Sequence, residues 1–445
     1  MTFSIIQKSQ LENFRLDAEF YQAEYFIDFT KSKWESVADN FNCQYGLSLA
    51  MNDEKTGYPM YKMDDINGCF LMSDEVRFAR VTEAEYKTFK LNENDVLFNR
   101  VNSEEFVGRT GIFKNDIDGI FASYLIRLTS KPDSKILPDY LNSFLNSQFG
   151  LKQIKRYSRR AVNQANINAE ELKKFKIALI PIQDQELIRK LSNDSWNEIQ
   201  NSKKFYHQAE DLLLKELGLK DFNEENKLFS IVNLSEVQKF GRIDAEYFLP
   251  KYLQLQAKLE NISQPLFKLI ENIPAKFEPT KEPNKEFKYV ELANINSSNG
   301  LIDDYAIVLG KVAPSRARRI IKVGDVIVSS VEGSLNKVAL VKEEQGDYLA
   351  STGFFQFRSD KILPEALLVL MKSIVMQWQL KQNCAGTILT AVPCETLNKM
   401  HIPILKTETQ QKIADLVRQS HTARQKSKEL LDEAKRKVEE MIEKE

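Results

Sequence analysis

Hydrophobic and polar residues follow two kinds of pattern along this chain, and each kind occurs in both halves. Short apolar or alternating runs bounded by Gly, Asn and Asp predict strands at 95–101, 110–114 and 123–128, and again at 325–331, 337–342 and 353–358. Two longer apolar stretches open with a proline and an acid, which predicts helices at 138–156 and 364–380. The patterns therefore predict α+β domains with a mainly antiparallel or mixed sheet.

The recurrence of these patterns reflects a repeated sequence. The segment RLDAEFY at 15–21 returns as RIDAEYF at 242–248, and KILP at 135–138 returns at 361–364. Other matches are shorter, and the offsets run in order from about 225 to about 230 residues. Solenoid repeats are far shorter, at roughly 20–50 residues. Two homologous modules in one chain indicate a protein that recognises two similar targets at once.

Each repeat ends in a stretch with a helical period. Alternate steps of four and three residues from Ile188 to Glu216 and from Ile413 to Met441 trace mostly apolar or small residues, in register at an offset of 225. This heptad-type pattern predicts two long helices that pack on each other. An antiparallel pair about 30 residues long would hold the modules about 45 Å apart, on the order of one turn of B-form DNA or a little more.

Composition leaves nucleic-acid binding open. The chain has 445 residues, of which 42% are hydrophobic and 28% charged, and a net charge of −1, all ordinary for a globular protein. Its four cysteines lack CxxC pairs and metal-type spacing with histidine, so we expect free thiols in a reducing cytosol. The sequence has no secretion-signal pattern and no apolar run of about 18 residues, and we expect a soluble, cytoplasmic protein.

Each repeat also carries one basic run that contains no acid, at 151–160 and at 311–322. A single run of this kind is usually a solvated surface, but one run per repeat favours contacts with phosphates. The expected phosphate contacts are Lys152, Lys155, Arg156, Arg159 and Arg160 in the first repeat and Arg316, Arg318 and Arg319 in the second.

The sequence lacks the common catalytic motifs. It has no Walker A sequence, GxGxxG, GxSxG or HExxH, and no Pro-Pro pair of the kind found in amino-group methyltransferase active sites. A nuclease-like arrangement of Pro138-Asp139 with Glu171-Leu172-Lys173 is of a kind that arises frequently by chance. The carboxylates repeated within 15–21 and 242–248 follow an arginine, so we expect salt bridges there. The chain is therefore expected not to be an enzyme.

The organisation resembles the specificity (S) subunits of type I restriction–modification systems over the whole chain. Three features carry the resemblance twice and in the same order: the opening RLDAEFY or RIDAEYF, a strand-and-turn segment, and an apolar-proline segment that leads into the long helix. The last two are 94–113 and 174–188 in the first repeat and 324–341 and 400–413 in the second. The proline-rich run that is usual before the helix is reduced here to Pro181 and Pro403.

The resemblance implies two homologous target-recognition domains joined by two long antiparallel coiled-coil helices with pseudo-two-fold symmetry. The implied parts are target-recognition domain 1 at 1–180, spacer helix 1 at 181–218, target-recognition domain 2 at 219–405 and spacer helix 2 at 406–445. Each domain would read half of an asymmetric bipartite site in double-stranded DNA, and the chain would dock two methyltransferase (M) subunits and two restriction/translocase (R) subunits. The chain itself would hold no cofactor or metal, whereas its partners would use S-adenosylmethionine, ATP and Mg.

By this resemblance, the loops 157–166 and 383–391 are expected near DNA, where side chains that reach base edges give sequence readout. The expected contacts there are Arg159, Arg160, Asn163 and Gln164 in the first repeat and Thr387 and Thr390 in the second. A second group follows the central strands and comprises Arg100, Asn102, Arg109, Ser330, Asn336 and Lys337. Because the framework motifs match while the loops differ, the two domains are expected to read different half-sites.

Three other classes of function stay open. A stand-alone sequence-specific DNA-binding protein would bind tightly without a methyltransferase. A coiled-coil scaffold with two protein-binding domains would show no salt-dependent affinity for DNA. A nuclease with duplicated domains would cut DNA by itself in the presence of a metal, and the cutting would depend on Asp139 or Glu171.

Overall fold

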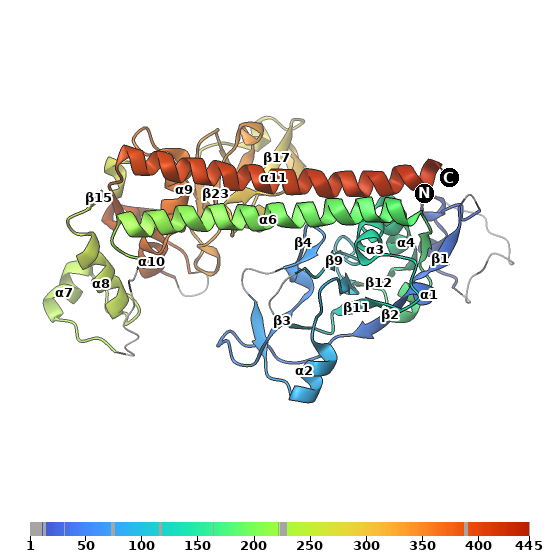
Figure 1. Cartoon of the computed structure of the whole chain (residues 1–445). Helices are drawn as coiled ribbons and strands as arrows, with labels where there is room; N and C mark the ends of the chain where they lie inside the picture. The colour runs from blue at the N-terminus through green and yellow to red at the C-terminus, as the bar shows by residue number, and fades with distance from the viewer. Residues whose placement is uncertain are drawn as a thin grey trace. The chain divides into compact units, whose positions relative to one another are not determined.

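The computed structural model describes residues 11, 15–30, 32–72, 76–114, 118–162, 164–220, 222, 229–386 and 390–444. The chain divides into two compact units, of which unit 1 comprises residues up to Ile199 and from Gln425 onward, and unit 2 comprises Gln200–Arg424. Each unit contains a globular part and one section of each of two long helices, α6 (Ile182–Glu216) and α11 (Thr407–Lys444) (Figure 1). The boundaries predicted for the two target-recognition domains and the two spacer helices remain predictions.

Unit 1 is built on a six-stranded sheet in the order β2-β11-β7-β9-β5-β4. Its neighbouring strands are antiparallel, except for the parallel pair β5 and β9. The strands are β2 (Phe41–Tyr45), β4 (Ile66–Asn67), β5 (Phe70–Leu71), β7 (Val96–Asn99), β9 (Thr110–Ile112) and β11 (Leu125–Ser130). The three strands predicted from the first repeat are therefore confirmed, and they are adjacent in the sheet.

Smaller sheets and short helices surround this sheet in unit 1. The other strands are β1 (Trp34–Ser36), paired with β14 (Lys176–Ala178); β3 (Tyr58–Tyr61), between β6 (Arg77–Ala79) and β10 (Ile120–Phe121); and β8 (Val101–Asn102), β12 (Arg159–Ala161) and β13 (Gln164–Asn166). The helices are α1 (Val37–Asn40), α2 (Glu83–Phe89), α3 (Pro138–Leu145), α4 (Gln148–Tyr157) and α5 (Ala169–Lys173).

Unit 2 contains two four-stranded sheets, in the orders β16-β25-β22-β23 and β20-β17-β24-β21. The first is antiparallel and comprises β16 (Glu271–Asn272), β22 (Val326–Ser329), β23 (Val338–Leu340) and β25 (Phe354–Arg358), which confirms the strands predicted from the second repeat. The second, with one parallel pair, comprises β17 (Glu286–Val290), β20 (Ala306–Leu309), β21 (Ala317–Ile320) and β24 (Leu349–Ser351). The α-helices of its globular part are α7 (Leu234–Phe240), α8 (Pro250–Leu259), α9 (Pro364–Lys372) and α10 (Ile374–Gln382). Two further strand pairs are β15 (Ser263–Pro265) with β26 (His401–Pro403) and β18 (Ile295–Asn296) with β19 (Leu301–Ile302).

The helices predicted at 138–156 and 364–380 are each two helices instead of one. The breaks fall at Ser147, between α3 and α4, and at Ser373, between α9 and α10, with both serines in an extended conformation. Each serine hydroxyl donates to a carbonyl three residues earlier, that of Phe144 or Leu370, at 2.7 Å. This local bond satisfies a carbonyl at the helix end and competes with continuation of the helix. The apolar period continues through the break and therefore did not reveal it.

The heptad ladders on α6 and α11 lie in the interior of each unit, as predicted. In unit 1 the hydroxyls of Ser195 and Ser427 are 2.8 Å apart, and in unit 2 the hydroxyls of Ser202 and Ser420 are 3.0 Å apart. The two pairs occupy equivalent positions of the two repeats. In each unit the residue number rises along one helix as it falls along the other, so the sections pack antiparallel.

Each pair of helix sections shares a hydrophobic core with the globular part of its unit. Ile188 and Val438 lie in one core with Phe98 of β7, whereas Leu213 and Ile413 lie in another with β22. The helices are therefore part of the folded units and are not appended to them.

The four cysteines are free thiols, as expected. Burial raises the pKa of the Cys43, Cys69 and Cys384 thiols to about 11, which keeps them protonated at neutral pH. Within the described part of the chain, no helix has both the length and the apolar character needed to cross a membrane.

Candidate nucleic-acid interface

In unit 1 the backbone after β7 pairs with the backbone after α4, and in unit 2 the backbone after β22 pairs with the backbone after α10. In unit 1, β8 pairs with β13, and the Ile167 N–H donates to the Arg100 carbonyl at 2.9 Å. In unit 2, Val331 bridges to Ala391, and the Val392 N–H donates to the Ser330 carbonyl at 2.8 Å. The turn residues and the loops predicted as separate groups of contacts therefore lie side by side on one framework.

The duplicated Arg-x-Asp motif fastens the base of this framework. Arg15 donates to the Tyr157 carbonyl at 3.3 Å, and Arg242 donates to the Cys384 carbonyl at 3.1 Å. Each arginine also forms the expected salt bridge with the aspartate two residues later, and this hydrogen bond lowers the pKa of both carboxyls. The motif thus fixes the end of the second helix, where each candidate interface begins.

The segment 157–166, predicted as a loop, contains a β-hairpin. Arg159 pairs with Asn166 and Ala161 with Gln164, and the other edge of β13 pairs with β8. The backbone groups of this polar segment find partners in a three-stranded sheet, which the composition of the segment did not reveal. The hairpin holds its side chains at defined positions along a ribbon.

Two carboxylates from distant parts of the sequence face the arginines of this hairpin. Glu171 bonds Arg159 at 2.8 Å, and Glu104 bonds Arg160 at 2.7 Å. The side chain of Arg159 is 60% exposed, whereas that of Glu171 is 6% exposed and also bonds Lys174. Lys174 would stay beside the Glu171 carboxylate if Arg159 turned toward solvent. The basic run is compensated in space although no acid lies within it.

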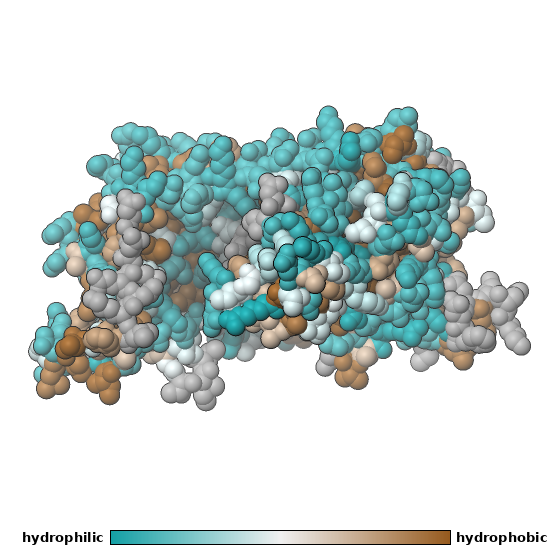
Figure 2. Space-filling model, turned by 60° about the horizontal axis from the view of Figure 1, so that its bottom comes forward, coloured by the Kyte–Doolittle hydropathy of each residue, from teal (hydrophilic) through white to brown (hydrophobic). Residues whose placement is uncertain are grey.

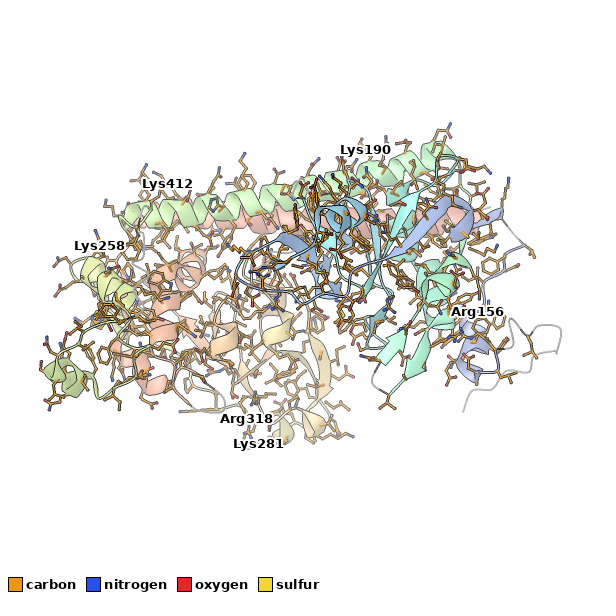
Figure 3. All side chains as sticks on the ribbon, turned by 90° about the horizontal axis from the view of Figure 1, so that it is seen from below. Arg156, Lys190, Lys258, Lys281, Arg318 and Lys412 are labelled. Atoms are coloured by element: carbon orange, nitrogen blue, oxygen red, sulfur yellow. The ribbon has the colours of Figure 1, made fainter. Side chains whose placement is uncertain are left out.

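The basic residues on α4 are less exposed than the two arginines of the hairpin. Lys152 and Lys155 are half-buried on α4, and Lys155 Nζ donates to the Glu104 carbonyl at 2.7 Å. Arg156 is buried, with its guanidinium 4.4 Å from the ring centre of Phe20 and 4.7 Å from that of Phe26 (Figure 3). The interpretation of Arg156 as a phosphate contact is therefore wrong for the described structure, because the turn of α4 directs it into an aromatic cluster.

The remaining candidates of unit 1 surround the hairpin. Gln164 and Arg109 are exposed, and Arg109 lies over the Phe106 ring at 3.9 Å. Arg100 and Asn102 are half-buried, and Arg100 Nε donates to the Ser123 carbonyl at 2.7 Å. Asn163 lies outside the described residues.

The arginines of the second basic run alternate between solvent and interior. Arg316 is exposed, and Arg318 is half-buried with its guanidinium 3.7 Å from Glu278, which also pairs with Lys281 (Figure 3). Arg319 is buried, donates to the Ile273 carbonyl and has a pKa lowered by desolvation. The prediction of Arg319 as a phosphate contact is therefore wrong for this structure, because successive side chains of β21 point to opposite faces.

The other candidates of unit 2 lie around the same backbone crossing. Ser330 Oγ donates to the Gly353 carbonyl at 3.0 Å, and Lys337 Nζ donates to the Ile295 carbonyl at 2.7 Å. Thr390 Oγ1 donates to the Gly386 carbonyl at 3.4 Å, and Asn336 is half-buried. Thr387 lies outside the described residues. The Glu332 N–H donates to the Thr390 carbonyl at 3.0 Å and the Glu332 carboxylate pairs with Lys381, so an ion pair also lies at the crossing of unit 2.

Sequence reasoning missed three residues at the interface of unit 1, namely Glu104, Glu171 and Val162. The acids were missed because they lie outside the basic run. Val162, between β12 and β13, is 93% exposed. Val162 could have been noticed in the sequence as a β-branched residue within a polar, turn-like segment, where Gly, Asn or Asp is usual.

The nuclease-like motif does not assemble. Asp139 is buried against Lys114 at 2.9 Å, whereas Glu171 bonds Arg159 and Lys174. Over the described ranges of the chain, no cluster of three or more His, Cys, Asp or Glu side chains is placed to hold a metal ion. These two carboxylates therefore form ion pairs within the fold.

Comparisons with known proteins give a consistent result. Residues 28–207 match the family described as Type I restriction modification DNA specificity domain. The chain is 25% identical over 416 residues to the putative type I restriction enzyme MjaX specificity subunit of Methanocaldococcus jannaschii, covering 88% of both chains. It is 27% identical over 167 residues to the type I restriction enzyme EcoKI specificity subunit of Escherichia coli K12, covering 37% of this chain and 35% of that one.

A solved type I restriction–modification S subunit from M. genitalium is 13% identical, with a TM-score of 0.40, and the alignment covers 94% of this chain and 98% of that chain. The sequence matches confirm the resemblance to type I restriction specificity subunits, and residues 28–207 match the Type I restriction modification DNA specificity domain family.

Proposed function

We propose that this chain is the specificity subunit of a type I restriction–modification complex and that each globular domain reads one half of an asymmetric bipartite DNA site. The observation that carries the proposal is that the two units share a backbone framework but differ in the segments at its ends, which we call the tips. Unit 1 presents a hairpin with Arg160 and Gln164, whereas unit 2 presents a short bridge of Ala385 and Ala391 beside Thr390. A common framework would orient both tips alike, and different side chains would read different bases.

The helix pair would set the distance between the two half-sites. A helix of 35 residues such as α6 extends roughly 52 Å at 1.5 Å per residue, enough to exceed one turn of B-form DNA. The serine pairs of the two helices occupy equivalent positions in the repeats, which supports a pseudo-two-fold coiled coil. Target-recognition domains at 1–180 and 219–405 would then lie at its two ends.

Partner docking is supported by an apolar residue that both repeats retain and neither buries. Leu16 and Ile243 occupy the same position of the duplicated motif and are 80% and 89% exposed. Solvent exposure at both positions favours a partner that is present twice, for which the methyltransferase subunit is the proposed candidate. Methyltransferase subunits would bring S-adenosylmethionine, and two restriction subunits would bring ATP and Mg.

The test is to map adenine methylation across the genome of a host that co-expresses the chain with its neighbouring methyltransferase gene. We expect a new asymmetric motif of two short half-sites around a fixed gap. Exchange of residues 1–180 for the same domain of a related subunit should change one half-site only. Absence of methylation from a soluble, assembled complex would contradict the proposal. Tight specific binding by the isolated chain would favour a stand-alone DNA-binding protein.

A further inference from the structure

Val162 is the most exposed large hydrophobic residue among those that the structure describes, at 93%. The face seen in Figure 2 is mostly hydrophilic, with hydrophobic residues scattered over it. An isolated exposed apolar residue is ordinary on a protein surface. The position of Val162 is not ordinary, because it lies at the tip of the hairpin that forms the candidate interface of unit 1.

Turn chemistry does not explain a valine at this position. The pairing of Ala161 with Gln164 leaves two residues between the strands, Val162 and Asn163, the second of which lies outside the described residues. Two-residue hairpin turns favour Gly, Asn and Asp, so the turn itself gives no reason for a valine here. A local choice that neither the turn nor the core requires points to a function outside the folded chain.

The surroundings of the tip indicate what Val162 contacts. Arg159 and Arg160 lie on β12 beside it, and Gln164 is exposed on β13. The major groove admits a two-stranded ribbon, arginines on its strands reach phosphates or guanine, and glutamine pairs with adenine. The 5-methyl group of thymine is the apolar feature of base edges in that groove.

We infer that the β12–β13 ribbon enters the major groove of the half-site read by unit 1 and that Val162 contacts the 5-methyl group of a thymine there. This inference rests on the proposed function and adds one specificity-determining residue and the base that it reads. Removal of either the valine side chain or the thymine methyl group abolishes the contact. The two changes therefore have coupled effects on methylation. Loss of the burial of about one methyl group corresponds to about a fourfold decrease in kcat/KM.

The experiment uses the assembled complex with its methyltransferase and a duplex that carries the bipartite site found by methylation mapping. Each thymine of the half-site assigned to unit 1 is replaced in turn by deoxyuridine, which lacks the 5-methyl group. We expect one replacement to lower kcat/KM for methylation about fourfold with the wild-type complex. Val162→Ser should remove this sensitivity, as should Val162→Gly, which suits a tight turn. Val323→Ser, at a half-exposed valine of unit 2, is the matched control and should keep it.

Several results would overturn the inference while the proposed function stands. These are a half-site without thymine, equal rates on all deoxyuridine duplexes, and unchanged sensitivity in both Val162 variants. Loss of the methyltransferase from the complex in the Val162 variants, seen by size-exclusion chromatography, would also overturn it, because Val162 would then belong to a protein interface. A wild-type complex that methylates no bipartite motif would contradict the proposed function itself.

Discussion

Removal of one serine from a buried pair on the long helices should destabilise the protein more than removal of both. In unit 1, Ser195 Oγ lies 2.8 Å from Ser427 Oγ and 3.0 Å from the Ser427 carbonyl, and both side chains are buried. Ser195→Ala leaves the Ser427 hydroxyl buried without its partner, whereas the double substitution to alanine removes both hydroxyls. Leaving one buried polar group unsatisfied costs more than replacing both by apolar groups of similar shape.

The magnitude follows from the geometry. The Ser427 carbonyl lies within α11 and keeps its helical hydrogen bond, so only the hydroxyl loses its partner. We expect a loss of about 1–2 kcal/mol for Ser195→Ala and a change near zero for the double variant. Ser427→Ala should cost little, because the Ser195 hydroxyl keeps its bond to the Ser427 carbonyl, so the coupling energy is about 1–2 kcal/mol. Ser192→Ala is the matched control, because the Ser192 hydroxyl is buried on the same helix without a hydrogen-bond partner among the described residues. It should be neutral or slightly stabilising.

Hydrogen exchange of peptides from α6 and α11 is the suitable assay, since a chain with two compact units need not unfold in a single step. The opening free energy of each seam is measured separately in the wild type, both single variants and the double variant. Ser202 and Ser420 provide an independent repeat of the measurement in unit 2. A double variant that loses the sum of the two single effects would refute the reasoning.

Three further predictions concern other parts of the chain. Burial lowers the pKa of His421 to about 4, so the unfolded chain protonates first as pH falls through about 6.5. Unit 2 should lose about 2 kcal/mol between neutral pH and pH 5, and His421→Asn should flatten this dependence in hydrogen exchange. Asp139→Ala leaves Lys114 buried without its carboxylate and should destabilise unit 1 by about 3 kcal/mol in the same assay, whereas a change under about 1 kcal/mol would contradict a buried pair. Arg159→Ala should reduce the slope of log affinity against log salt for DNA by about one, and an unchanged slope would exclude Arg159 as a phosphate contact.

Elements present in both repeats were predictable from the sequence because their patterns occur twice. The strands β7 and β22 are short apolar runs that are buried on both faces, and the helical ladders on α6 and α11 follow a heptad period and are buried as that period requires. The salt bridge of the Arg-x-Asp motif was also predictable, because two opposite charges one residue apart recur together. Local patterns were sufficient where burial of apolar residues determined the structure.

Features that depend on distant partners were not predictable. The hairpin at 159–166 exists because β13 pairs with β8, and Arg156 is buried because an aromatic cluster from residues 20–26 covers it. Arg319 is buried although Arg318, its neighbour, is not. A basic run in a sequence therefore shows which charges are available but not which of them reach the surface.

The duplication also separates residues that maintain the fold from residues that face outward. Gln185 accepts a hydrogen bond from the Leu137 N–H at 2.8 Å, and Gln410 accepts the equivalent bond from the Leu363 N–H at 2.9 Å. A side chain kept in both repeats with the same buried bonds maintains the framework. An exposed position that differs between repeats, such as those of the tips, is available for specificity. Leu16 and Ile243, at the start of the duplicated motif, fit neither class. The fold does not bury these apolar side chains, and half-sites of different sequence would not preserve an apolar residue in both repeats. The proposed partner, bound once by each repeat, would explain its retention.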